Sequence, residues 1–179
     1  MTIPTSIVPR PSVQLPHHRI HEGNHFTIHR ITTSLAGIKY FLIIPPPVQV
    51  PHSATVEIHV IFDIVSDLGV QFEFFEDGTV TANGSPLMPI NNNRNSLTTA
   101  LTQVFEDPTV TSDGLKLAEE RIGSATSGGS TGEEFRDEDE FVLRIGSIYL
   151  IKIIPLNPPI NITTEISWYD ARPSSPIPP

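Results

Sequence analysis

Proline is the residue that most constrains how this chain can fold, because it supplies 18 of the 179 residues. That is about twice the roughly 5% of average usage. Helix interiors exclude proline, which lacks a backbone N–H and clashes with the preceding turn. The prolines crowd both ends of the chain and elsewhere separate apolar segments. The sequence therefore predicts a protein that is not helical, with proline-rich ends.

Alternating apolar residues indicate β-strands. In residues 55–64, valine, isoleucine or phenylalanine occupies every second position, as expected for a half-buried strand. The same pattern recurs at 70–74, 141–145 and 162–168, and 148–154 is almost continuously apolar. Further strands are predicted at 24–32, 37–44, 79–82 and 97–102, and a short helix could form only at 115–122.

Turn residues separate these strands. Asp77-Gly78 and Asn83-Gly84 are typical of hairpin turns. Eight to ten short strands with turns between them favour an antiparallel sandwich or barrel. We therefore expect an all-β fold, an antiparallel jelly-roll-like β-sandwich, with an immunoglobulin-like sandwich as the second choice.

Composition divides the chain into a central domain and two arms. Residues 1–16 form a proline-rich N-terminal arm, 17–170 form the β-sandwich domain, and 171–179 form a second proline-rich arm. Within the domain, 121–140 is a loop rich in glycine, serine and acidic residues. Proline-rich segments are extended and lose little entropy on ordering, so the two arms can lie along a neighbouring subunit.

The overall composition argues against several classes of protein. The formal net charge is −9, whereas binding to nucleic acid through phosphates usually needs a basic patch. The absence of cysteine excludes disulfides, thiolate metal sites and cysteine nucleophiles. Neither a signal-peptide pattern nor an apolar run near the ~20 residues of a membrane span is present. We expect a soluble protein made in a cytoplasm, with no nucleic-acid or membrane partner.

The histidines His21, His25 and His29 are spaced four residues apart. This spacing would suit a zinc site on a helix, but the surrounding sequence favours an extended segment. On a strand such residues lie about 13 Å apart and cannot share one ion. His59, from another strand, could approach them only if the sheets bring it there. We predict a polar strand face or an interface edge, and no metal ligands.

Other polar clusters carry little chemistry. The acidic residues at 133–140 lack the spacing of an EF-hand and predict a hydrated loop. The Asn91–Ser96 run predicts a structured turn, in which Arg94 could alternatively bind a carboxylate or a sugar. The sequence has no nucleophile elbow, Walker loop or dinucleotide-binding glycine motif. We therefore predict no catalytic residues and no cofactor.

Five segments in a fixed order resemble those of tailed-bacteriophage virion proteins. They are HHRIHEGNHFT at 17–27, FFEDGTVTANGSPL at 74–87, NNNRNS at 91–96, EFVLRIGSIYLIKI at 140–153 and SWYD at 167–170. The resemblance spans residues 17–170 and is to capsid decoration, or cement, proteins. It implies a β-sandwich on the outer surface of the phage head, without an enzymatic role and without catalytic residues to carry over.

The leading hypothesis is a phage capsid decoration protein that stabilises contacts between major capsid protein subunits. It would be a homo-oligomer, a trimer or a dimer, located in the virion. The alternative is a glycan- or receptor-binding module of a tail or head fibre, since jelly rolls commonly bind sugars. An enzyme ranks third. The candidate capsid or subunit contacts are Pro4, Pro9, Pro11, Pro16, His17, His18, His21, Arg94, Pro173 and Pro176.

Overall fold

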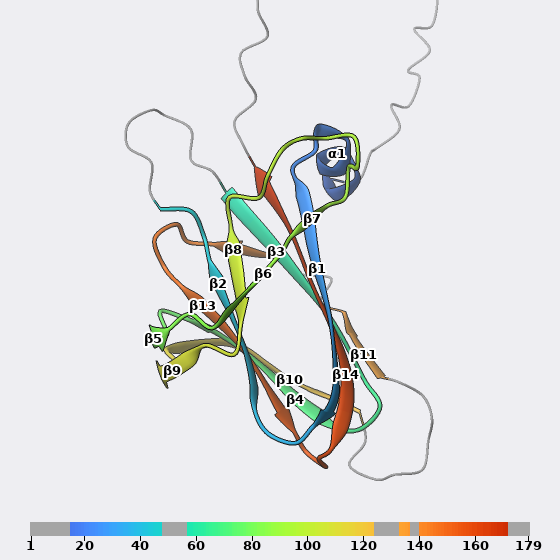
Figure 1. Ribbon diagram of the computed structural model, residues 1–179, viewed down its shortest axis with the longest axis vertical. Coiled ribbons are helices and arrows are strands. Elements are labelled where there is room, and N and C mark those ends of the chain that lie inside the picture. The colour runs from blue at the N-terminus through green and yellow to red at the C-terminus, as the bar shows by residue number, and fades with distance from the viewer. Residues whose placement is uncertain (1–14, 48–56, 124–132, 137–139, 172–179) are drawn as a thin grey trace, which may run out of the picture.

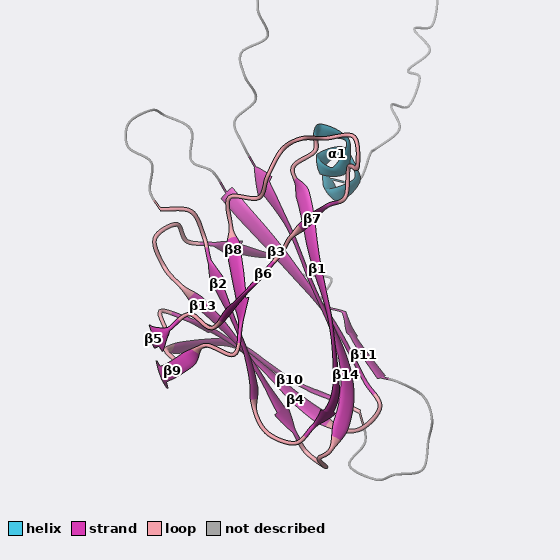
Figure 2. Cartoon of the chain, viewed as in Figure 1, coloured by secondary structure: helices cyan, strands magenta, loops and turns pink. Residues whose placement is uncertain are grey.

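The computed structural model describes residues 15–47, 57–123, 133–136 and 140–171. Within these ranges, two antiparallel sheets face each other, and one short helix lies at the end of the sandwich (Figures 1 and 2). The helix α1 comprises Leu15–Glu22. The eight framework strands of the sandwich are β1 His25–Leu35, β2 Lys39–Ile44, β3 Glu57–Ser66, β4 Val70–Glu76, β10 Leu115–Ile122, β12 Phe141–Leu143, β13 Tyr149–Pro155 and β14 Ile160–Ala171.

The order of these strands defines a jelly roll. One sheet has the order β12–β3–β14–β1, and the other has the order β10–β4–β13–β2. Consecutive strands of this framework lie in opposite sheets, except for β4 and β10, which pair with each other in one sheet, as in the double-sheet jelly roll. In an immunoglobulin fold the first two strands belong to one sheet, whereas here β1 and β2 belong to different sheets. The predicted all-β jelly-roll-like sandwich is thus confirmed, and the immunoglobulin-like alternative is wrong.

The core lies between the sheets and follows from the alternation in the sequence. On β3 the buried side chains are those of Ile58, Val60, Phe62 and Ile64, at every second position. The ring of Phe62 packs against aromatic rings of the opposite sheet, with centroid distances of 5.5 Å to Phe72 and 4.8 Å to Phe74. Across β1 and β14 the register places Phe26 opposite Trp168 and Ile28 opposite Ile166.

An insertion of residues 77–114 separates β4 from β10. It contains β5 Thr79–Ala82, β6 Ser85–Leu87, β7 Ile90–Asn91, β8 Gln103–Glu106 and β9 Thr109–Ser112. The strands β8 and β6 extend one sheet beyond β2, and β7 extends the other beyond β1. The strands β5 and β9 pair with each other, and Val80 and Val110 pack on a second small core of Leu42, Phe75 and Leu150.

Asp77-Gly78 does not form the predicted hairpin. Both edges of β4 are occupied by β13 and β10, so β5 has no edge of β4 with which to pair. Residues 97–102 form no strand either, contrary to prediction. They link β7 in one sheet to β8 in the other, and this crossing leaves them without a neighbouring strand.

The short helix lies outside 115–122, the segment in which the sequence allowed one. Residues 115–122 form β10, because pairing with β4 overrides their helical propensity. The described helix, α1, begins at Leu15 and includes His21, so the extended conformation predicted for the histidine segment is wrong at His21. Pro16 lies in the first turn of α1, where a proline has no intrahelical hydrogen bond to lose.

The predicted loop at 121–140 also contains regular structure. β10 continues to Ile122, and β11 Glu133–Arg136 pairs with β3 in register with Ser66 to Asp63. The free edge of β3 explains this strand, because it offers backbone groups to the acidic segment. Of the predicted arms at 1–16 and 171–179, residues 15–16 belong to α1 and Ala171 to β14, and the remaining residues lie outside the described part of the chain.

Candidate interaction surface at one end of the sandwich

The asparagine-rich turn holds α1 and the insertion together. The side-chain amide of Asn91 donates hydrogen bonds to the carbonyl oxygens of Gly23 and Thr98, each at 2.9 Å, and its Oδ1 accepts one from the N–H of Asn93. Asn93 in turn donates to the carbonyl oxygen of His21 at 3.1 Å. The predicted structured turn is confirmed, and it ties the end of α1 to the loop that follows β7.

Gly23 makes this close approach feasible. Its φ is +73°, a left-handed backbone conformation that residues with a side chain rarely adopt. A Cβ at this position would lie 2.3 Å from the Oγ of Ser96. A glycine at position 23 therefore allows the junction between α1 and β1 to pack against the insertion.

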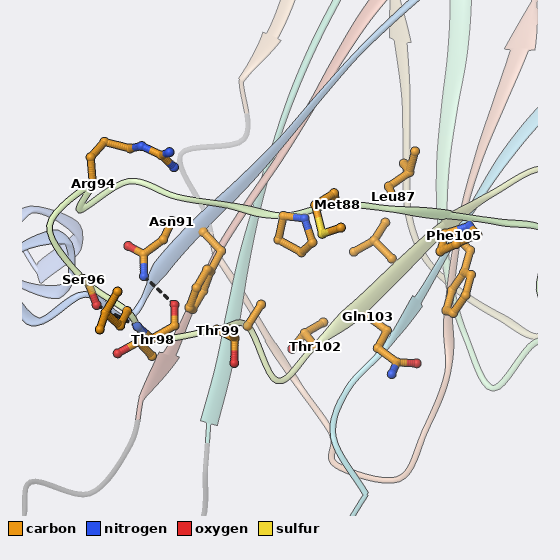
Figure 3. Close-up of a pocket in the computed structure, with 16 residues that line it drawn as sticks. Leu87, Met88, Asn91, Arg94, Ser96, Thr98, Thr99, Thr102, Gln103 and Phe105 are labelled. Atoms are coloured by element: carbon orange, nitrogen blue, oxygen red, sulfur yellow. Dashed lines mark hydrogen bonds between the residues drawn. The ribbon is translucent and has the colours of Figure 1, made fainter.

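A groove of about 610 Å³ lies between the edge strands of the two sheets (Figure 3). Buried Phe26 and Val104 contribute to its lining, whereas Met88 and Leu97 are 87% and 98% exposed. Aspartate, glutamate and lysine are absent from the residues that line it in the described part of the chain. Those residues are Phe26, Pro86, Leu87, Met88, Pro89, Asn91, Arg94, Ser96, Leu97, Thr98, Thr99, Ala100, Thr102, Gln103, Val104 and Phe105.

The groove also contains polar groups able to bind a ligand. Thr102 is only 2% exposed, and its Oγ1 has no hydrogen-bond partner among the described residues. A buried hydroxyl without a partner costs free energy, but this one is covered and does not reach the surface of the groove. Arg94 and Gln103 provide donors along the exposed part of the groove. The groove thus combines an apolar lining with hydrogen-bond donors.

The end of β14 lies against the same loop. The Oδ2 of Asp170 accepts a hydrogen bond from the N–H of Leu101 at 3.2 Å, and the N–H of Asp170 donates to the carbonyl oxygen of Asn24 at 3.0 Å. The chain leaves the described structure directly after Ala171. The C-terminal arm therefore starts beside the residues that line the groove.

A stacked row of rings crosses the outer face of the β1–β14–β3 sheet near α1. Tyr169 lies between His59 and His25, at centroid distances of 4.6 and 6.4 Å. Its hydroxyl donates to Glu140 at 2.5 Å, and the Nδ1 of His59 lies 3.1 Å from the same carboxylate. The guanidinium of Arg19 lies 6.0 Å from the centre of the Tyr169 ring.

Burial shifts the pKa of two residues in this row, Tyr169 and His25. It raises the pKa of Tyr169 well above its usual range, and the hydrogen bond to Glu140 adds to the effect. Burial also lowers the pKa of His25, although the negative charge of Glu165 opposes the shift. Tyr169 and His25 are therefore neutral at pH 7, and the stacked row is a packed, hydrogen-bonded part of the outer face of the sheet.

The structure brings together some of the residues selected from the sequence. His18 and His21 are exposed on α1, and Arg94 is exposed beside the groove. Pro16 and His17 belong to α1, but their side chains lie outside the described part of the structure. The other candidates, Pro4, Pro9, Pro11, Pro173 and Pro176, lie outside the described residues altogether.

The sequence analysis missed Met88 and Leu97. The available signal was a large apolar residue on each side of a polar, asparagine-rich turn. Leu97 also fits the alternating pattern that predicts a strand at 97–102, and Met88 fits no predicted element. An apolar side chain beside such a turn does not reach the core between the sheets, so Met88 and Leu97 are exposed to solvent.

His21, His25 and His29 are divided between α1 and β1. In the described part of the chain, no three histidine or acidic side chains are grouped closely enough to hold a metal ion. None of the described helical segments is long and apolar enough to cross a membrane.

Comparisons with protein-family models, with curated proteins and with solved structures find no match to this chain. The fold defines the class of the protein, an all-β jelly roll with an insertion between β4 and β10.

Proposed function

We propose that this protein is a capsid decoration protein that binds the outside of a phage head and stabilises contacts between major capsid protein subunits. In this role it has no enzymatic activity. The proposal follows the ordered resemblance of residues 17–170 to phage decoration proteins. It also draws on the arrangement of one end of the sandwich.

The observation that carries the proposal is the concentration of contact features at that end. The C-terminal arm starts beside the groove, and α1, into which the N-terminal arm leads, is hydrogen-bonded to the turn that forms part of it. The exposed apolar side chains of Met88 and Leu97 lie there too. Exposed apolar side chains next to extended segments suit a protein that attaches to another surface.

The rest of the sandwich suits a rigid module. On the outer face of the β10–β4–β13–β2 sheet, charges are paired, as with Lys152 and Asp113 at 2.6 Å and Lys116 and Glu73 at 2.5 Å. The net charge of −9 would reduce adhesion to DNA during assembly. Such a body can project from a capsid while its arm-bearing end makes contact.

The glycan-binding alternative lacks an aromatic platform. Trp168 is 1% exposed, and Tyr149 and Tyr169 are also fully buried. These residues contribute to the core or to the stacked row and are inaccessible to a sugar ring. Tyr40 is only half-buried, but its hydroxyl donates to Asp113, and this single ring makes no platform.

The proposal is tested with two truncated chains, one lacking residues 1–13 and one lacking 172–179. Both deletions stop short of α1 and β14, so circular dichroism and the thermal midpoint should match those of the full chain. Binding to purified heads stripped of this protein should fall at least about tenfold, equivalent to about 1.4 kcal/mol.

The matched control removes residues 127–130 from the connection between β10 and β11, and it should bind heads as the full chain does. Unchanged binding by both truncations would contradict the proposal. So would a specific hit on a glycan array together with no binding to heads.

A further inference from the structure

The chemistry of the groove selects its ligand. Its lining is apolar and free of acidic residues, so it does not favour a cationic ligand. The exposed donors of Gln103 and Arg94 favour a partner rich in acceptors. An uncharged extended peptide meets these requirements, and a proline-rich peptide does so best, because its carbonyls are exposed and it has few N–H groups.

Residues 173–179 of this chain have that chemistry. Their sequence is PSSPIPP, with four prolines, one isoleucine and no charged side chain. Such segments form a polyproline helix and dock in grooves lined by aromatic and apolar side chains, losing little entropy. The N-terminal arm fits less well, because its central Arg10 would approach Arg94.

The length of the arm allows it to reach a groove on another copy. Arg172 precedes a proline, and such a residue favours an extended backbone. At ~3.1 Å per residue, seven residues span about 22 Å, enough to reach a neighbouring molecule.

We propose that the groove between β6, β7 and β8 binds residues 173–179 of a second copy of this chain. Each copy then has one arm and one groove. Exchange of arms therefore gives either a reciprocal dimer or a closed ring, as expected for a heterologous contact that closes. This interaction is independent of any capsid, so it can hold or fail separately from the proposed function.

The test uses the absence of cysteine in the chain. Gln103→Cys is placed in one full-length chain and Ser175→Cys in another that carries a tag of different mass. Both are mixed with a mild disulfide oxidant. The mixed disulfide dimer should form about tenfold more than when Ile31→Cys, at a 69% exposed site away from the groove, replaces Gln103→Cys. Its yield should rise with protein concentration.

Two further measurements link the disulfide to the groove. Leu97→Asp, added to the Gln103→Cys chain, places a carboxylate among the apolar side chains at a site that is exposed and so should not affect folding. It should lower the yield about tenfold. An excess of the free peptide RPSSPIPP should compete and lower the yield likewise.

Three results would overturn the proposal. The first is a mixed dimer no more abundant than with Ile31→Cys. The second is a better yield when Ser6→Cys, on the N-terminal arm, replaces Ser175→Cys. The third is a chain carrying both Gln103→Cys and Ser175→Cys that links only within itself at every concentration, because the arm would then occupy its own groove.

Discussion

The eight-strand framework and the insertion at 77–114 are stabilised in different ways. The framework has long strands, such as β1 with 11 residues and β14 with 12, whose inward side chains are buried. The strands of the insertion have only two to four residues and are largely exposed. Turns and side-chain hydrogen bonds hold the insertion, as at Asn91 and at Gly114, whose φ is +91°.

This contrast suggests that the framework provides the stability of the fold and the insertion provides a surface for binding. Most large apolar side chains of the framework are buried between the sheets, although Ile31, Leu115 and Val142 are exposed. In the insertion, short strands and crossings between the sheets leave Met88 and Leu97 at the surface. Burial of apolar area dominates the free energy of folding, so the framework determines stability. The insertion is then able to vary its surface for binding.

The largest expected effect comes from the framework. Phe62→Ala should lower the free energy of unfolding by about 3–5 kcal/mol, because it opens a cavity among packed aromatic rings. Urea unfolding monitored by the fluorescence of Trp168, the single tryptophan, measures this loss. Phe62→Leu is the matched control and should cost less. A loss below about 1 kcal/mol for Phe62→Ala would show that the core does not dominate.

A smaller effect is expected in the insertion. Asn91→Ala removes hydrogen bonds to Gly23, Thr98 and Asn93 and should cost about 1–2 kcal/mol. Amide hydrogen exchange should accelerate in 91–102 and stay slow in β3 and β14. Asn95→Ala, at an exposed asparagine of the same turn, is the control. Equal acceleration throughout the sandwich would mean that the insertion and the framework unfold as one unit.

The smallest effect is expected at the seam between the two regions. Because burial holds the pKa of His25 below 6.5, the unfolded state binds more protons than the folded state as the pH falls below 6.5. Stability from this group is therefore present above pH 6.5 and is lost as the pH falls toward the lowered pKa.

The urea concentration at the midpoint of unfolding should thus be lower at about pH 5.5 than at about pH 7.5, and His25→Gln should flatten this dependence on pH. His29→Gln, at an exposed histidine of the same strand, is the control and should keep the dependence. A steeper fall in His25→Gln would contradict the sign of the shift.

The same contrast explains what the sequence could predict. β3, β4, β13 and β14 follow from alternating or continuous apolar residues, because a half-buried strand imposes a period of two. The sequence allowed a short helix at Leu115–Ile122, which contains good helix formers, and only the edge of β4 explains why this segment pairs as the strand β10. Local propensity does not include that edge.

The candidate surface was only partly predictable. The asparagine-rich turn and Arg94 were identified, since asparagine favours hydrogen-bonded turns. The groove could not be predicted, because it depends on the distance between two sheet edges that are remote in sequence. The alternation of Leu97, Thr99 and Leu101 even suggested a strand, although Leu97 is 98% exposed.

The pairing of β1 with β14 has a consequence for folding during synthesis. The first framework strand lies between β14 and the two-residue strand β7, and Phe26 meets Trp168 across the longer pairing. Most of the partners that β1 needs are thus made last, so a ribosome-bound chain cannot complete its sandwich before residue 171 emerges. Topologies dominated by such non-local pairing fold slowly. The hydrogen bonds that link Asp170 to Asn24 and Leu101 consequently form only when the final strand docks.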